Sequence, residues 1–329
     1  MAKENSKLRF YDSYKIENLN PDTLRLWSKY KIDMELRELS ERTQEGYYND
    51  LLHWWIYVYD HQGNQSIVDL TEDDLVEFFY FCKKGGNSSR RMRRRMASVS
   101  AFYKFLRKKK FISDNPMEFI DRPTKDTDVA VQTFLTTEQV DQMRKSLSDQ
   151  VENASTDHQK HAWMSIRCYA FFSLSTMARV TAVSNTRWEQ IDFESRIVSD
   201  VVEKEGYVVD LYFSEEVKSY LLELKQYRDG NRIDDGGYVF AAYSSSVYNK
   251  ATVGTLNQWC KRVGDLIGVP TLHPHDFRHS GATLLKNSGM SLEDVSKLLN
   301  HKGTDVTSKY YIKEDKKAIQ SAKDRFEAF

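Results

Sequence analysis

Residues 271 to 313 hold the pattern that most restricts how this chain can fold. Pro274 is followed by His275 and Arg278, which are three residues apart and so share one face of a helix that the proline is suited to begin. A second helix is predicted from Ser291, because Ser-Leu-Glu-Asp is a capping pattern and the apolar residues after it recur at helical spacing. The stretch therefore predicts two helices, the first of which presents an imidazole and a guanidinium to one anion.

The side chains around these two helices extend the set of candidate reactive groups. His301 stands where the second helix is predicted to end, and Tyr310 follows it by nine residues. Upstream, residues 196–213 are typical of a hairpin, because two β-rich runs flank a glycine, and Lys204 lies at its tip. Arg179 precedes the hairpin. Each of these residues alone is more often a surface or packing residue, so their order along the chain carries the information.

That order resembles the catalytic set of the tyrosine recombinases, the phage-type integrases. In this family Arg, Lys, His, Arg, His or Trp, and Tyr follow one another along the chain. The resemblance covers most of the sequence and implies a site-specific recombinase that cuts and rejoins DNA through a 3′-phosphotyrosine intermediate. The residues that it marks as catalytic are Arg179, Lys204, His275, Arg278, His301 and the nucleophile Tyr310.

The region around Arg179 follows the family pattern only in part. The pattern is roughly G-x-R-x-x-E, then a hydrophobic residue, Trp and Asp, and here Trp188 and Asp192 fit. Ala182 stands where an acidic residue is usual, and Thr186 stands where leucine is usual. These departures would weaken the support of Arg179. Ala182, together with Asn300 where the family more often has glycine before the histidine, leaves an alternative function open, a DNA-binding regulator that keeps the fold without the chemistry.

General chemistry is consistent with the roles that the resemblance implies. Cleavage of a phosphodiester needs a nucleophile, positive charge at the phosphoryl oxygens and a proton for the leaving oxygen. Guanidiniums bind phosphate bidentately and stay charged, histidines transfer protons near neutral pH, and Lys204 would donate to the leaving oxygen. The family places its tyrosine nine residues after the His or Trp, which selects Tyr310 over Tyr311. No cofactor is implied, and no carboxylate cluster has metal-ligand spacing, which disfavours a metal-dependent nuclease.

A basic run forms the second candidate site. No acidic residue occurs between Lys83 and Lys110, while apolar residues recur at helical spacing. We therefore expect a helix with one packed face and one basic face that binds DNA phosphates, rather than a merely solvated charge run. The pattern resembles the core-binding domain of the same family. The residues predicted to bind DNA are Lys83, Lys84, Arg90, Arg91, Arg93, Arg94, Arg95, Lys104 and Arg107.

Capping patterns and scarce proline and glycine predict a mainly α fold with a small β-hairpin or sheet. A length of 329 residues suits two domains. We expect an arm over residues 1–20, a helical core-binding domain over 21–120, a polar linker over 121–133 and a mixed α/β catalytic domain over 134–329. The resemblance implies that the two domains form a clamp on double-stranded DNA.

Composition bounds the remaining possibilities. The formal net charge is zero, so the distribution of charge, not its sum, points to nucleic acid. Cys82, Cys168 and Cys260 fit neither a disulfide framework nor a zinc pattern, and no signal peptide or long apolar run appears. A reducing, cytoplasmic location without membrane contact is expected.

Residues 314–329 form a charged stretch with apolar positions at helical spacing. In the family, a comparable tail docks on a neighbouring subunit. The resemblance therefore implies self-association on DNA through this tail, although the segment is also able to fold back on its own domain.

Overall fold

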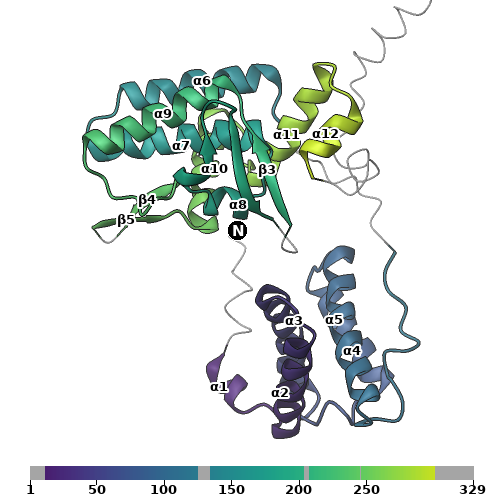
Figure 1. Ribbon diagram of the computed structural model, residues 1–329. Coiled ribbons are helices and arrows are strands. Elements are labelled where there is room, and N and C mark those ends of the chain that lie inside the picture. The colour runs from purple at the N-terminus through teal and green to yellow at the C-terminus, as the bar shows by residue number, and fades with distance from the viewer. Residues whose placement is uncertain (1–11, 125–133, 204–206, 245, 301–329) are drawn as a thin grey trace, which may run out of the picture. The chain divides into compact units, whose positions relative to one another are not determined.

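The computed structural model describes residues 12–124, 134–203, 207–244 and 246–300 (Figure 1). The chain separates into two compact units, residues 1–129 and 130–329, and each contains a hydrophobic core of its own. Helices dominate both units and strands occur in the second, so the predicted fold class is confirmed. Among the described residues, no helix is both long enough and apolar enough to cross a bilayer.

The first unit consists of helices whose starts follow capping residues in the sequence. The Asn20 side chain caps a helix that begins with Pro21, and Thr71 forms a reciprocal capping box with Asp74. These caps satisfy backbone N–H groups that the first helical turn leaves without partners. The helices are α1 (Ser13–Glu17), α2 (Pro21–Leu36), α3 (Glu41–His61), α4 (Glu72–Lys84) and α5 (Ser89–Lys108).

Aromatic side chains fill the core of the first unit. Trp54 and Trp55 from α3, Phe78 from α4 and Phe102 from α5 are each exposed by 1% or less. The hydroxyl of Tyr103 donates to the carbonyl of Ile67 at 2.8 Å, which satisfies the polar end of a buried ring. These contacts hold one face of α5 against the core, so the opposite face of this helix is the one that meets solvent.

The helices of the second unit are α6 (Thr137–Glu152), α7 (Asp157–Thr176), α8 (Val180–Asn185), α9 (Glu215–Gly230), α10 (Val253–Leu266), α11 (Pro274–Asn287) and α12 (Leu292–Leu298). Helix α7 is the central one and packs against α6, α9, α10 and α11 (Figure 1). A Cβ at Gly281 of α11 would lie only 2.2 Å from the carbonyl oxygen of Leu174, so glycine permits close contact between α11 and α7. The C-terminal end of α7 is thereby held beside α11.

Two small antiparallel sheets complete the second unit. The hairpin predicted over residues 196–213 is confirmed as β2 (Ile197–Val202) and β3 (Val208–Tyr212), and β1 (Ile191–Asp192) adds a third strand beside β2. A second hairpin, β4 (Ala241–Ser244) and β5 (Val247–Lys250), is not predicted by the sequence. Both of its strands are mostly exposed, so they lack the alternation of apolar and polar residues that marks a strand in sequence.

Candidate active site and DNA-binding surface

Arg278 lies on the second turn of α11, which begins at Pro274 as the sequence predicts. Its side chain is only 2% exposed. One guanidinium nitrogen, Nη1, donates to the carbonyl of Met177 at 2.6 Å, and Nη2 donates to the carbonyl of Leu299 at 2.6 Å. The guanidinium is therefore fixed where α11, the turn after α7 and the residue after α12 meet.

Arg179 is brought to the same place by the turn between α7 and α8. Met177 adopts a left-handed conformation with φ of 53°, which ends α7, and Arg179 is the N-cap residue of α8. Nη1 of Arg179 forms an ion pair with Oε2 of Glu203, and Nη1 of Arg278 lies 3.9 Å from Oε1 of the same carboxylate. Two arginines distant in sequence therefore meet at one buried acid.

His275 lies one turn before Arg278 on α11 and is exposed at the surface. Its ring contacts the ring of His279, with centroids 4.4 Å apart. Partial burial lowers the pKa of His275 below its usual value, and the positive charges of Arg278 and Arg179 add to the effect. The imidazole is therefore neutral at physiological pH and lies within electrostatic reach of both arginines.

Lys204, His301 and Tyr310 lie outside the described residues. Two described residues that contact Arg179 or Arg278 lie close in sequence to Lys204 and His301. Glu203 comes directly before Lys204, and Leu299, whose carbonyl Arg278 binds, comes two residues before His301. The described part of the predicted catalytic set is thus Arg179, His275 and Arg278, and the structure brings these three together.

The outer face of α5 carries the second candidate site. Arg90, Arg94, Lys104 and Lys108 are exposed and recur at spacings that return to one face of a helix. Lys83 and Lys84 are exposed at the end of α4, and Arg91 is exposed in the first turn of α5. This arrangement agrees with the predicted helix of one packed and one basic face.

The expectation that no acidic residue neutralises this run is wrong, because packing brings acids from other segments. Arg94 forms an ion pair with Asp50 of α3 at 3.1 Å, and Arg107 pairs with Glu118 at 3.1 Å. Arg93 is half-buried and donates to the carbonyl of Pro123 at 2.5 Å. The two ion pairs lower the net charge that Arg94 and Arg107 offer to DNA, whereas Arg93 keeps its charge and has one donor occupied by a carbonyl.

Arg95 does not belong to the basic face. Its side chain is buried, with 2% of the residue exposed, and Nη1 contacts Sγ of Cys82 at 3.0 Å. Arg95 follows Met92 by three residues and precedes Val99 by four, so the helical period itself places it on the packed face. That spacing is the signal that distinguishes Arg95 from its basic neighbours.

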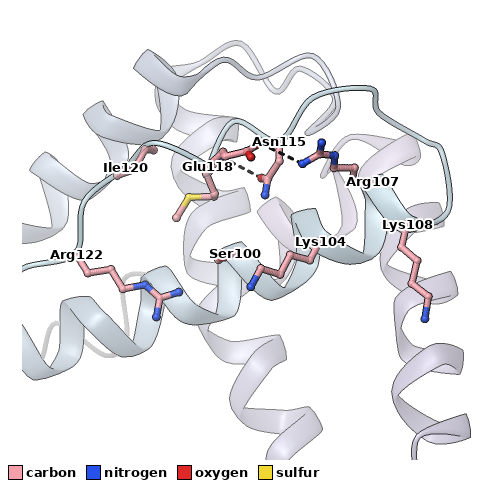
Figure 2. A pocket seen from close by; sticks show the side chains of 9 residues that line it. Ser100, Lys104, Arg107, Lys108, Asn115, Glu118, Ile120 and Arg122 are labelled. Atoms are coloured by element: carbon pink, nitrogen blue, oxygen red, sulfur yellow. Dashed lines mark hydrogen bonds and ion pairs between the residues drawn. The ribbon is translucent and has the colours of Figure 1, made fainter.

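An open groove of about 570 Å³ lies along the C-terminal half of α5. Figure 2 shows the Arg107 side chain turned toward Glu118, whereas the Lys108 side chain points away from it. Lys104 and Arg122 also line the groove and are exposed. The groove therefore presents cations whose distribution suits an extended anion such as a nucleic acid backbone.

Comparison with protein families decides what kind of protein carries these two sites. A model described as the phage integrase family matches residues 133–317, more than half of the chain. The chain belongs to the phage integrase family. A second model, the phage integrase N-terminal SAM-like domain, matches residues 28–110 and covers most of α2 to α5. The family resemblance inferred from the residues is thereby confirmed.

Relatives of this integrase-family chain include tyrosine recombinases of bacteria. Tyrosine recombinase XerC of Anoxybacillus flavithermus is 27% identical over 301 residues, which cover 90% of this chain and 94% of the relative. Tyrosine recombinase XerC of Lactobacillus delbrueckii subsp. bulgaricus is 24% identical over 284 residues, which cover 83% and 89% of the two chains.

Solved structures of similar fold include two integrase-type proteins on DNA. The Tn1549 transposon integrase in complex with transposon right end DNA has a TM-score of 0.64 and 20% identity, covering 92% of this chain and 99% of that one. The XerH site-specific recombinase bound to a palindromic difH substrate has a TM-score of 0.66 and 16% identity, covering 97% and 94%. These similarities show that this family member has the two-part recombinase fold.

The residue that sequence reasoning missed in this integrase-family site is Glu203. In sequence it is one of several charged residues at the tip of a hairpin, where solvated side chains are usual. Its burial follows from an irregularity within β2, where the pairing register shifts between Val198 and Val201. A pattern of strict alternation does not reveal such a shift.

Proposed function

We propose that this protein is a site-specific DNA recombinase that cuts and rejoins DNA with Tyr310 as its nucleophile. The phenol oxygen of Tyr310 attacks the scissile phosphorus, a bond forms between them, and the bond from phosphorus to the 5′ oxygen breaks. The DNA 3′ end is then held as a phosphotyrosine, and the released 5′ hydroxyl of another strand reverses the step. Lys204 is proposed to give the leaving 5′ oxygen its proton.

The observation that carries the proposal is the convergence of Arg179, His275 and Arg278 on one site. Two guanidiniums beside a phosphodiester stabilise the negative charge that gathers on the phosphoryl oxygens in the transition state. Arg278 is held by two backbone carbonyls, and Arg179, whose backbone occupies the N-cap position of α8, is held by its ion pair with Glu203. Such groups need little reorganisation when the charge develops.

His275 complements the two arginines because its imidazole is neutral. A neutral ring both donates and accepts a hydrogen bond, so it can accept a proton from an attacking phenol or donate to a phosphoryl oxygen. In the protein without DNA, burial and the charges of the neighbouring arginines lower its pKa and so favour this form. His301 is proposed to donate a second hydrogen bond to the same phosphate.

The basic face of α5 is proposed to hold the duplex through its phosphates. Contacts from exposed cations are independent of base sequence and set the affinity and its salt dependence. The relatives are named as recombinases and integrases, which favours catalysis over a regulator that only binds DNA. We place the protein in the cytoplasm, where it would meet its DNA.

Covalent trapping on a nicked duplex tests the proposal. The duplex would carry the sequence recovered by mapping the DNA that the protein binds, and a nick beside the scissile bond would let the released fragment diffuse away. We expect a protein–DNA adduct from the wild-type protein and none from Tyr310→Phe. The variant removes one hydroxyl, so DNA affinity should stay within about twofold.

Tyr311→Phe is the matched control, since it removes the same hydroxyl one residue along and should retain adduct formation. An adduct from Tyr310→Phe but not from Tyr311→Phe would assign the nucleophile to Tyr311. If the wild-type protein yields no adduct on any bound sequence, the regulator is the better description of this chain.

The tail at residues 314–329, which lies outside the described residues, is proposed to dock on a neighbouring subunit on DNA. Its apolar positions at helical spacing support a packed role. Deletion of residues 316–329 should abolish multimers on DNA in gel-shift assays while single-site binding persists. Normal multimers from the truncated protein would assign the tail to its own domain.

A further inference from the structure

We infer that Glu203 is a positioning residue of this site, whose carboxylate holds the guanidiniums of Arg179 and Arg278 in the arrangement that receives the scissile phosphate. The inference rests on the proposed cleavage activity. Glu203 is not one of the six residues that the family resemblance marks as catalytic. Glu203 itself would not touch the reacting atoms.

The contacts of Glu203 are those of a buried counter-ion. Its side chain is 3% exposed, Oε2 pairs with Nη1 of Arg179, and Oε1 lies 3.9 Å from Nη1 of Arg278. Glutamate is rarely this buried unless it is paired, because an unpaired buried charge loses its hydration. Oε1 has no hydrogen-bond partner among the described residues, so its link to Arg278 is electrostatic, while the direct pairing of Oε2 holds Arg179 beside the Arg278 guanidinium that the two backbone carbonyls fix.

The backbone of β2 is built to turn this side chain inward. Val198 is buried and the pairing register shifts before Val201, with Asp200 in the left-handed region at φ of 58°. The extra residue changes which face each later side chain occupies, so Val201 and Glu203 are buried while the residue between them is exposed.

Three hydrogen bonds hold the shifted strand in place. The side-chain amide of Gln190 donates to the carbonyls of Ser199 at 3.2 Å and Asp200 at 3.0 Å. The backbone N–H of Glu203 donates to the carbonyl of Tyr207 at 2.8 Å. The position of the carboxylate is therefore set by the strand rather than by a flexible side chain alone.

No carboxylate on α8 is available for this task. The helix that Arg179 caps contains no acidic residue, and Ala182, at the position where the family pattern has an acid, is buried. The negative charge beside Arg179 comes instead from Glu203, the residue directly after β2. This arrangement gives a physical account of how the departure at Ala182 is compatible with an ordered arginine site.

The charge balance of the cluster suits a phosphodiester. Among the residues that the structure describes, two guanidiniums and one carboxylate leave one net positive charge, so this cluster attracts an anionic phosphodiester even with Glu203 in place. Without the carboxylate, the repulsion between the two guanidiniums would be uncompensated by Glu203, and Arg179 would lose its ion pair with this residue. The added positive charge would still attract DNA, so the expected loss is in geometry and rate rather than in ground-state affinity.

Single-turnover trapping separates a positioning role from a merely structural one. For Glu203→Gln we expect full adduct amplitude, a rate constant lower by on the order of 10²-fold, and DNA affinity equal to or tighter than wild type. Glu189→Gln is the matched control, since it removes one negative charge from a 73%-exposed side chain of the same unit, paired with Arg187. The control should react at the wild-type rate.

Two results would overturn the role of Glu203. One is a rate constant for Glu203→Gln within about twofold of wild type, and the other is a lower amplitude with an unchanged rate constant, which marks loss of folded protein only. If Glu203→Gln does not fold, Glu203→Asp keeps the charge but withdraws it by one methylene. It should show full amplitude at a rate at least about tenfold below wild type, and a wild-type rate would refute the positioning role.

A second measurement keeps this inference separate from the proposed activity. If wild-type protein forms no adduct, the recombinase proposal fails, and inorganic sulfate still reports on the arginine pair. Removing the carboxylate should make the sulfate-induced rise in melting temperature larger in Glu203→Gln than in wild type or Glu189→Gln. Equal rises in all three proteins would show that Glu203 does not neutralise the arginines.

Discussion

The outer face of α5 allows a quantitative prediction about DNA affinity. Arg90, Lys104 and Lys108 are exposed on that face, and within residues 12–124 that the structure describes, none of them belongs to an ion pair. We therefore expect each to contact one phosphate. Arg94 and Arg107, by contrast, are paired with Asp50 and Glu118 and contribute less.

Changing Arg90, Lys104 and Lys108 together to alanine should remove three phosphate contacts. Each contact contributes about 0.9 to the slope of log affinity against log salt, so the slope should become shallower by about 2.7. Over a fourfold rise in salt, the wild-type protein should then lose about 40-fold more affinity than the variant. The loss should be the same for unrelated sequences, because phosphate contacts carry no base information.

Fluorescence anisotropy with a labelled nonspecific duplex, titrated from low to high KCl, measures this slope directly. The matched control changes Arg25 and Lys31 of α2, and Arg37 at the C-cap of this helix, to alanine, which removes the same net charge from ion-paired, exposed positions of the same unit. Its slope should stay at the wild-type value. An unchanged slope in the α5 variant, or an equal loss in the control, would refute the assignment of this face to DNA.

Three further predictions follow from the buried groups and the chain's organisation. Arg95→Met should leave the salt slope unchanged and should not lower the melting temperature, because the buried guanidinium is replaced by an apolar side chain of similar length; a slope reduced by one contact would contradict this. Burial lowers the pKa of His53 to about 4 and that of His161 to about 3, so between pH 6.5 and 4 the unfolded chain binds protons that the folded protein does not. The free energy of unfolding should fall as pH falls through this window, less steeply in a double Gln variant of both histidines, and equal slopes in thermal melts would show that the histidines are not responsible. We also propose that residues 121–133 link two domains, so a protease acting on the protein without DNA should cut there first. Earlier cleavage at another place, with residues 121–133 intact, would disprove this boundary.

The sequence was informative wherever a structural feature is encoded over a few neighbouring residues. The cap at Ser291 and the proline at 274 predicted helix starts that the structure contains, because capping depends on side chains within one turn of the helix. The hairpin over 196–213 was readable for the same reason, since its two runs are joined by a short turn.

The basic run shows where local reasoning ends. Its helical period is local, and applied strictly it would have assigned Arg95 to the packed face with Met92 and Val99. The pairing of Arg94 with Asp50 is not local, because that acid comes from a helix more than forty residues earlier. Absence of acids from a stretch of sequence therefore does not predict absence of acids around its side chains.

The sequence alone determined the family, the two-part helical fold and the order of the reactive residues, because helical periods, caps and motif spacings are properties of adjacent residues. Only the tertiary structure decided that Arg179 and Arg278 meet at Glu203. That meeting depends on an irregularity in β2 that turns one side chain inward, and on the close contact of α11 with α7 at Gly281. Both are consequences of packing between segments far apart in the chain, and their energies are not encoded in any one stretch of residues.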